Sequence, residues 1–178
     1  MTTMVGHPVP HVAVDAYVRD EPEPVRLSPR DFGGRWVVLF FYPRDFTFVC
    51  PTELRAFAEL HADFEAEDAV LLAASTDSYW SHKAWFESHG LLRDVMFPVL
   101  ADTAHDLADA CGVLLPDGSA LRTTIVVDPD GIVRHLTVTD NNVGRSPDET
   151  LRVLQALRTG ELCPVSWRPG QPTMAKAA

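Results

Sequence analysis

Apolar and polar residues follow two patterns that alternate along the chain. Continuous runs of apolar, β-branched and aromatic residues at 35–42 and 69–76 are typical of strands buried on both faces. Shorter runs predict strands around 12–17 and at 96–102. Two further runs within 122–138 flank a Pro-Asp-Gly turn, which predicts a β-hairpin.

Segments with helical spacing lie between these strands. We expect helices over residues 52–67, 78–89, 104–111 and 147–159. The last of them begins with a capping box formed by Ser146 and Glu149, and Gly160 ends it. Because strands and helices alternate and one hairpin is added, we predict an α/β fold with a mixed central sheet flanked by helices.

The composition narrows the class of protein. A length of 178 residues fits one domain, which we expect to cover 1–160, followed by a Pro-rich C-terminal tail at 161–178. A net charge of −10 argues against a nucleic-acid partner or an anionic membrane. No apolar run approaches the roughly eighteen residues that span a bilayer, and the first residues lack the pattern of a signal peptide. We therefore expect a cytoplasmic protein.

The chain has three cysteines, Cys50, Cys111 and Cys163. The cytosol keeps thiols reduced, so we expect any disulfide to be transient and functional. No spacing of Cys and His resembles a zinc site, and we expect no metal. Cys111 falls on the apolar side of a short helix and is interpreted as core packing. Three histidines are expected to lie in solvent on helices: His61, His82 and His105.

The stretch FFYPRDFTFVCPTE, residues 40–53, places Cys50 between a buried strand and a helix start. Free N–H groups in the first turn of a helix favour an anionic sulfur, and the carboxyl edge of a sheet is where open α/β folds build their sites. Thr47 is in reach of that sulfur, and Pro43 shapes the start of the loop. The residues alone leave a nucleophilic cysteine and a buried structural cysteine evenly balanced.

Pro43, Thr47 and Cys50 fit the Pro-x-x-x-Thr-x-x-Cys core of the peroxiredoxins, and 40–53 as a whole resembles their peroxidatic signature. Residues 121–157 are similar to the second half of that family. The segment ELCPVSWRPG, around Cys163, resembles the part that carries the resolving cysteine of typical 2-Cys members. Within the family, the bacterial alkyl hydroperoxide reductase C components are the most similar branch. The resemblance implies a thioredoxin-like fold.

The resemblance also implies a thiol-dependent peroxidase that needs no cofactor and acts on hydrogen peroxide and organic hydroperoxides. Cys50 is then the peroxidatic cysteine, and its sulfenic acid forms an intersubunit disulfide with the resolving Cys163. This pairing implies a homodimer, and such dimers often assemble into rings of five. The reductant is a disulfide reductase: thioredoxin, a flavoprotein or a CXXC adaptor protein remain open.

Other residues receive roles from the same resemblance. Thr47 and Arg122 match groups that stabilise the sulfur and orient the peroxide, and Pro43 packs over the sulfur. Glu53 matches a residue that orients the arginine, with Arg145 as a second anchor. Position alone favours a surface charge for Arg122, and it explains Glu53 equally well as a first-turn helix carboxylate.

Two alternatives come from other chemistry. A thioredoxin-like disulfide reductase needs Cys-x-x-Cys, and here Glu53 stands at the second position. A redox-sensing holdase ring, with peroxidase activity secondary, is the alternative function that stays open.

We predict resistance to overoxidation. Peroxiredoxins that excess peroxide inactivates carry a Gly-Gly-Leu-Gly insertion and a Tyr-Phe-bearing C-terminal helix, whereas this chain reads SHGLLRDVMFPV and ends in RPGQPTMAKAA. A looser tail should let Cys163 reach Cys50 before a second peroxide does. Intact mass after turnover in excess peroxide tests this, and early gain of two oxygen atoms on Cys50 would contradict it.

Overall fold

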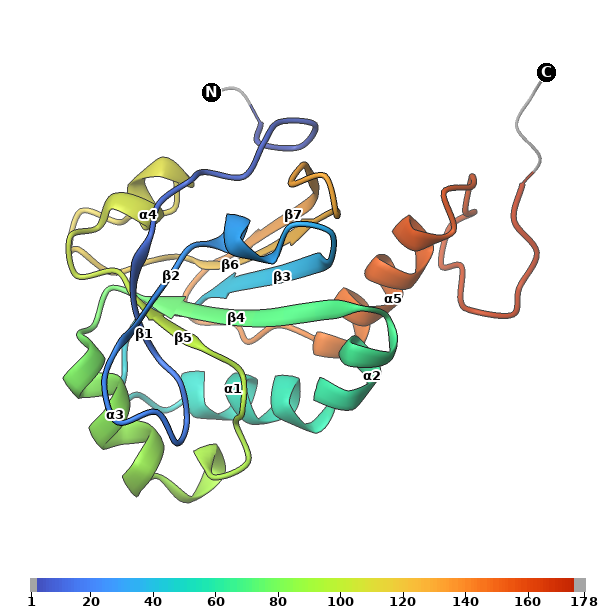
Figure 1. Ribbon diagram of the computed structural model, residues 1–178. Coiled ribbons are helices and arrows are strands. Elements are labelled where there is room, and N and C mark those ends of the chain that lie inside the picture. Colours follow the sequence, from blue (N-terminus) through green and yellow to red (C-terminus); the bar gives the residue numbers. More distant parts are fainter. Residues whose placement is uncertain (1–2, 175–178) are drawn as a thin grey trace.

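The computed structural model describes residues 3–174. In this part of the chain, seven strands form one sheet in the order β2-β1-β5-β4-β3-β6-β7 (Figure 1). The strands are β1 (Val14–Tyr17), β2 (Val25–Leu27), β3 (Trp36–Phe41), β4 (Ala69–Ser75), β5 (Val99–Ala101), β6 (Arg122–Val127) and β7 (Val133–Thr139). β4 pairs in parallel with β3 and β5, and the other pairs are antiparallel. The predicted mixed α/β sheet is confirmed.

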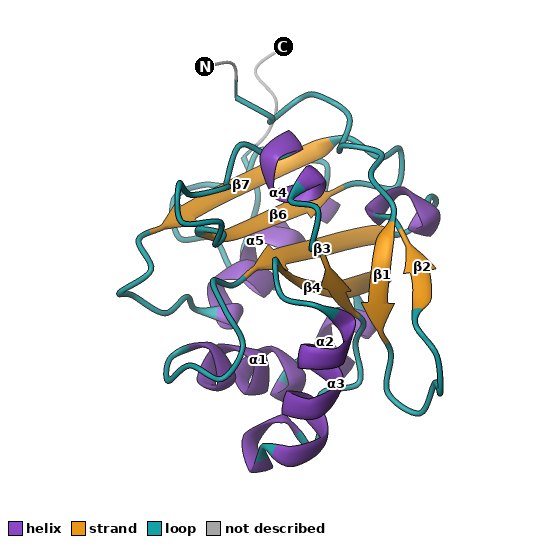
Figure 2. Ribbon diagram, turned by 90° about the vertical axis from the view of Figure 1, so that its left-hand side faces the viewer, coloured by secondary structure: helices purple, strands orange, loops and turns teal. Residues whose placement is uncertain are grey.

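Helices cover both faces of the sheet. They are α1 (Cys50–Glu59), α2 (His61–Ala66), α3 (Tyr79–Ser88), α4 (Asp106–Ala110) and α5 (Pro147–Arg158), with short 3₁₀ turns η1 (Pro29–Phe32) and η2 (Gly90–Leu92). α1, α2, α3 and α5 pack on one face, and α4 lies on the other (Figures 1 and 2).

β3 shows why a continuous apolar run predicts a central strand. Val38 and Phe40 point into the core beneath α1, α3 and α5, where the Phe40 ring stacks on Phe57 at 4.0 Å. Leu39 and Phe41 point into the second core, beneath α4. Both faces of the strand are therefore buried, as predicted.

Three local predictions differ from the structure. The helix expected over 52–67 is two helices, because Leu60 leaves helical geometry at φ −100° and ψ 8°. The strand β2 was not predicted, since it follows a Pro- and Glu-rich segment. At α5, Ser146 accepts the N–H of Glu149, but the Glu149 carboxylate pairs with Arg152 instead of completing the capping box.

The topology brings two distant segments to one edge of the sheet. Cys50 begins α1 shortly after the carboxyl end of β3. β6 runs antiparallel to β3, with Thr123 opposite Phe41, so Arg122 at the start of β6 lies at the same edge. After α5, the described part of the tail contains neither a helix nor a strand, apart from an isolated bridge between Leu162 and Met174. Residues 175–178 of the predicted tail lie outside the described part.

Candidate active site

Cys50 occupies the first helical position of α1, and its side chain is fully buried. Val49 precedes it as the N-cap, so the sulfur lies at the helix end where main-chain N–H groups are free. The guanidinium of Arg122 donates a hydrogen bond from Nη1 to the Cys50 sulfur at 3.4 Å. A cysteine that served only to fill the core would not need a buried cation beside it.

Arg122 is itself buried, with 4% of its side chain exposed, so the alternative of a surface charge is wrong. Its Nη1 also donates to the carboxylate of Glu53 at 2.5 Å. Its Nε donates to the main-chain carbonyl of Asn141 at 3.1 Å. The guanidinium is thus held on two edges, and one of its N–H groups is directed at the sulfur.

Glu53 joins the two arginines named in the sequence. Arg145 donates to Oε1 of Glu53 from its main-chain N and from Nε, both at 2.8 Å, and to Oε2 from Nη2 at 3.2 Å. Burial alone would raise the pKa of Glu53, but the hydrogen bonds and charge of Arg145, together with the charge of Arg122, lower it below its ordinary value. Glu53 is therefore an ionised bridge between Arg122 and Arg145.

The loop 43–49 holds the two remaining motif residues. Pro43 is buried at its start. The Thr47 hydroxyl donates to the main-chain carbonyl of Arg44 at 2.9 Å. The proton of the Thr47 hydroxyl is therefore engaged by the main chain, and its oxygen can still accept a hydrogen bond.

A buried polar cluster that the sequence analysis missed anchors this loop. The carboxylate of Asp45 accepts from the hydroxyls of Tyr42 and Ser81, each at 2.7 Å, and lies 2.8 Å from Nδ1 of His82. Burial, followed by the Asp45 charge, raises the pKa of Tyr42 well above its ordinary value, so the phenol stays protonated as a donor. The prediction that His82 is solvated is wrong, because its side chain is fully buried.

The next residue of the loop is strained. Phe46 has φ of 54°, in the left-handed region that bulky side chains rarely occupy. Its ring is 61% exposed and packs against Trp85 at 5.8 Å between centroids. The loop is thus anchored at Asp45, and the backbone of the next residue, Phe46, is strained.

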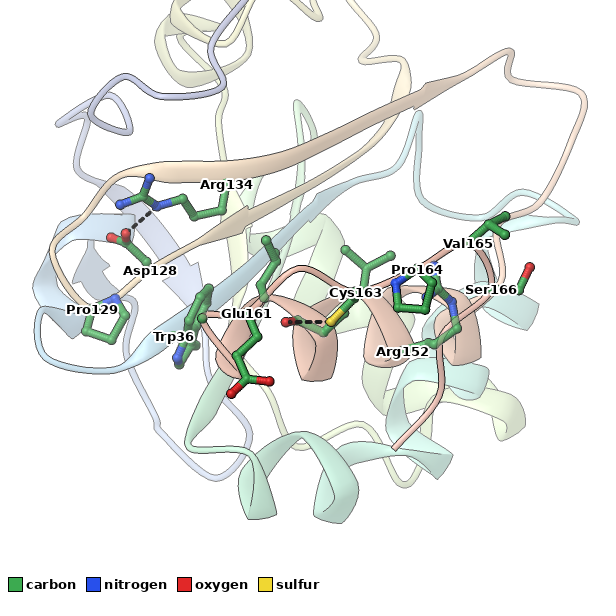
Figure 3. Close-up of a pocket in the computed structure, with 14 residues that line it drawn as sticks. Trp36, Asp128, Pro129, Arg134, Arg152, Glu161, Cys163, Pro164, Val165 and Ser166 are labelled. Carbon is green, nitrogen blue, oxygen red and sulfur yellow. Dashed lines mark hydrogen bonds and ion pairs between the residues drawn. The ribbon is translucent and has the colours of Figure 1, made fainter. Parts of the chain in front are cut away.

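Cys163 occupies a different environment. Its sulfur lies 3.7 Å from the main-chain carbonyl of Ala156 and 3.5 Å from the hydroxyl of Thr159, at the carboxyl end of α5 (Figure 3). It lines a cavity of about 830 Å³ together with Trp36 and Pro129. Cys50 thus sits at the amide end of one helix and Cys163 at the carbonyl end of another.

Cys111 is 5% exposed in the core beside α4, in agreement with the predicted packing role. Burial first, and then the charge of Asp102, raises the pKa of its thiol to about 12. Its sulfur therefore stays protonated at neutral pH.

Between residues 3 and 174, no three His, Cys, Asp or Glu side chains are grouped so as to hold a metal ion. Over the same range, none of the helices combines the length and the apolar character that crossing a membrane requires.

The mixed sheet, the buried cysteine at a helix start and the arginine that donates to its sulfur fit the reactive thiolate of a thiol-dependent peroxidase. Comparison with known proteins agrees: the model of the AhpC/TSA family matches residues 5–136. The chain belongs to this family. The predicted fold, family and enzyme class are confirmed.

Similar proteins carry consistent names. The alkyl hydroperoxide reductase C of Mycolicibacterium smegmatis is 46% identical over 84% of this chain and 76% of its own length. Peroxiredoxin prdx-2 of Caenorhabditis elegans is 47% identical over 96% of this chain and 88% of its own length. The reduced 2-Cys peroxiredoxin of Plasmodium vivax superposes with a TM-score of 0.94 at 33% identity, covering 99% of this chain and 95% of that one. These names do not favour the holdase alternative.

Proposed function

We propose that the protein reduces hydrogen peroxide and organic hydroperoxides at Cys50 and resolves the product with Cys163 of a second copy. The Cys50 thiolate attacks one peroxide oxygen: an S–O bond forms, the O–O bond breaks, and water or an alcohol leaves after protonation. The sulfur is oxidised by two electrons to a sulfenic acid. The Cys163 thiol then displaces the hydroxyl as water, which forms an S–S bond.

One observation carries this proposal, namely the contact of 3.4 Å between the Arg122 guanidinium and the buried Cys50 sulfur. A cation held in a water-poor site stabilises the thiolate and the charge that develops on the leaving oxygen. Glu53 and Arg145 act as positioning residues for Arg122 through their shared ion pairs. In this proposal Pro43 shelters the sulfur, and Thr47 contributes its hydroxyl.

The positions of the two cysteines favour a disulfide between chains. Cys50 and Arg122 lie at the carboxyl end of β3, whereas Cys163 lies in a cavity with Trp36, the first residue of β3. A strand of this length spans roughly 20 Å, and a disulfide needs Cα atoms about 6 Å apart. This separation supports a disulfide between Cys163 of one copy and Cys50 of another.

Disulfide formation also requires Cys50 to leave its buried position. The strain at Phe46 and the exposure of Phe48, at 95%, favour local opening of residues 46–49. We expect the opening to stop at Asp45, because its carboxylate is held by the buried Tyr42 and His82 and by the partly buried Ser81.

A homodimer is part of the proposal. β7 is the last strand of the sheet. The N-terminal segment hydrogen-bonds to its first residue, Val133, and beyond that residue no strand of the described part of the chain pairs with its outer edge, so a second copy can pair there. The exposed rings of Phe46, Phe48 and Trp80 offer an apolar surface for assembling dimers into a ring. A disulfide reductase (thioredoxin, a flavoprotein or a CXXC adaptor protein) then reduces the disulfide and completes the catalytic cycle. The proposed location is the cytoplasm.

Non-reducing electrophoresis after one equivalent of peroxide tests the proposal. We expect a covalent dimer in the wild type and none in Cys50→Ser or Cys163→Ser, and peroxide consumption should be lost in Cys50→Ser. Cys111→Ser is the matched control and should behave as the wild type, because that thiol stays protonated in the core. A covalent dimer or wild-type peroxide consumption in Cys50→Ser would refute the proposal.

A further inference from the structure

Arg122 depends on a residue that no motif marks. Asn141 lies in the segment between β7 and α5. Its main-chain carbonyl accepts from Nε of Arg122 at 3.1 Å, and its side-chain Oδ1 accepts the main-chain N–H of Arg122 at 3.2 Å. Its Nδ2 donates to the main-chain carbonyl of Ala120 at 3.4 Å. One asparagine therefore contacts both the main chain and the guanidinium group of Arg122.

The side chain of Asn141 closes the end of the β-hairpin. The register of β6 and β7 ends with Arg122 opposite Thr139. Beyond Thr139 the chain turns away, with the N–H of Val143 donating to the carbonyl of Asp140 at 3.1 Å. A carboxamide carries the same kinds of donor and acceptor as a peptide group. The carboxamide of Asn141 therefore takes the place of one more main-chain pairing at the point where β6 begins.

The same contacts determine where the guanidinium of Arg122 points. Its Nη1 serves both the sulfur of Cys50 and the carboxylate of Glu53. Its Nε is bound to Asn141 on another edge of the planar group. A planar fork held on two edges cannot rotate, so a shift of the Asn141 segment would turn the guanidinium away from the sulfur.

The segment is attached to the site at a second point. Arg145, four residues after Asn141, donates to Glu53 from its main chain and its side chain. Glu53 belongs to α1 and Arg122 to β6, so the short segment joins the two elements that meet at the sulfur. Within the segment between β7 and Arg145, the carboxamide of Asn141 is the only side chain in the described residues that hydrogen-bonds to β6. The next such bond comes from Arg145 itself, which donates to the main-chain carbonyl of Thr123.

We propose that Asn141 is a positioning residue for the peroxide reaction, whose carboxamide fixes the start of β6 so that the Arg122 guanidinium stays on the Cys50 sulfur. The inference rests on the proposed function, because it assigns Asn141 an effect only through these two residues. It adds a determinant of reactivity that lies outside the peroxidatic signature and outside the Glu53 and Arg145 ion pairs.

The first arm of the test compares Asn141→Ala with Asn142→Ala, a matched control in which the neighbouring, exposed asparagine changes. The measurement is the second-order rate constant for oxidation of the reduced protein by hydrogen peroxide. Asn141→Ala should lower it about tenfold, because a misplacement of about 1 Å can cost about 100-fold and loss of this carboxamide should shift Arg122 by less than that. Asn142→Ala should match the wild type. The thermal unfolding midpoint of each variant is measured, and all rates are taken well below the lowest of these temperatures.

The second arm is a double-mutant cycle with Arg122→Gln. If Asn141 acts by positioning Arg122, Asn141→Ala should add no further loss of rate in that background. The same tenfold loss in both backgrounds would mean a purely structural role and would overturn the inference. A wild-type rate in Asn141→Ala, with Arg122→Gln slow, would overturn the inference alone. Wild-type rates in Arg122→Gln and Cys50→Ser would instead overturn the proposed function.

Discussion

Replacing Arg122 by glutamine is expected to slow peroxide reduction by about two to three orders of magnitude, the loss typical of a donor aimed at developing charge. The substitution removes the cation that donates to the Cys50 sulfur at 3.4 Å. Glu53 keeps its hydrogen bonds with Arg145, so the fold should survive. The rate of thiol oxidation under single-turnover conditions measures the effect.

Two further variants make this result interpretable. Arg122→Lys keeps a charge but loses the planar fork, so its rate should fall between those of Arg122→Gln and the wild type. Arg26→Gln changes an exposed arginine on β2 that forms an ion pair with Asp15, and it should leave the rate unchanged. If Arg122→Gln stayed within threefold of the wild type, the contact with the sulfur would have no catalytic weight.

The central strand and the cysteine at the helix start could be predicted because both depend on local sequence. A run of apolar residues from Trp36 to Phe41 has one stable solution, a strand buried on both faces. Cys50 follows this strand after a short loop, so it had to lie near the carboxyl end of the strand. The predicted pairing of Glu53 with Arg122 and Arg145 came from the resemblance, and the structure supplies its physical form.

Side-chain direction and long-range partners could not be predicted in the same way. Thr47 is three residues from Cys50, but its spacing in the sequence does not show that its hydroxyl donates to the main-chain carbonyl of Arg44. His82 shares its helical face with Tyr79 and Phe86, a spacing that could have indicated burial. Its partner Asp45 lies 37 residues away in sequence, so no local pattern connects them.

Asn141 illustrates the same limit at a turn. In sequence it is one of two consecutive asparagines after a strand, where these residues commonly form turns. Only the register of β6 and β7 distinguishes it from Asn142, because that register brings its carboxamide to Ala120 and Arg122. Topology selects the residue, and topology becomes visible only in the folded chain.

Replacing Glu53 by glutamine is expected to be the most destabilising single change at the site. The carboxylate is 3% exposed and lies between the guanidinium groups of Arg122 and Arg145. Removing one partner of a buried ion pair leaves uncompensated charge and costs about 3 to 5 kcal/mol. Urea unfolding of the reduced protein at neutral pH measures this loss. Glu59→Gln is the control, since it breaks an exposed pair with Arg55 on the same helix and should cost at most about 1 kcal/mol.

The pH dependence of unfolding separates the charge of Glu53 from its packing. The pKa of Glu53 is lowered in the folded protein from an ordinary value of 4.5, so its carboxylate contributes stability above that value. This contribution is lost as the pH falls through the lowered pKa, because protonation then becomes possible in the folded state as well. The difference in unfolding free energy between wild type and Glu53→Gln should therefore be largest near neutral pH and shrink below about pH 4. A difference that stayed constant as the pH fell well below about 4 would contradict this prediction and assign the loss to packing instead of to the charge of Glu53.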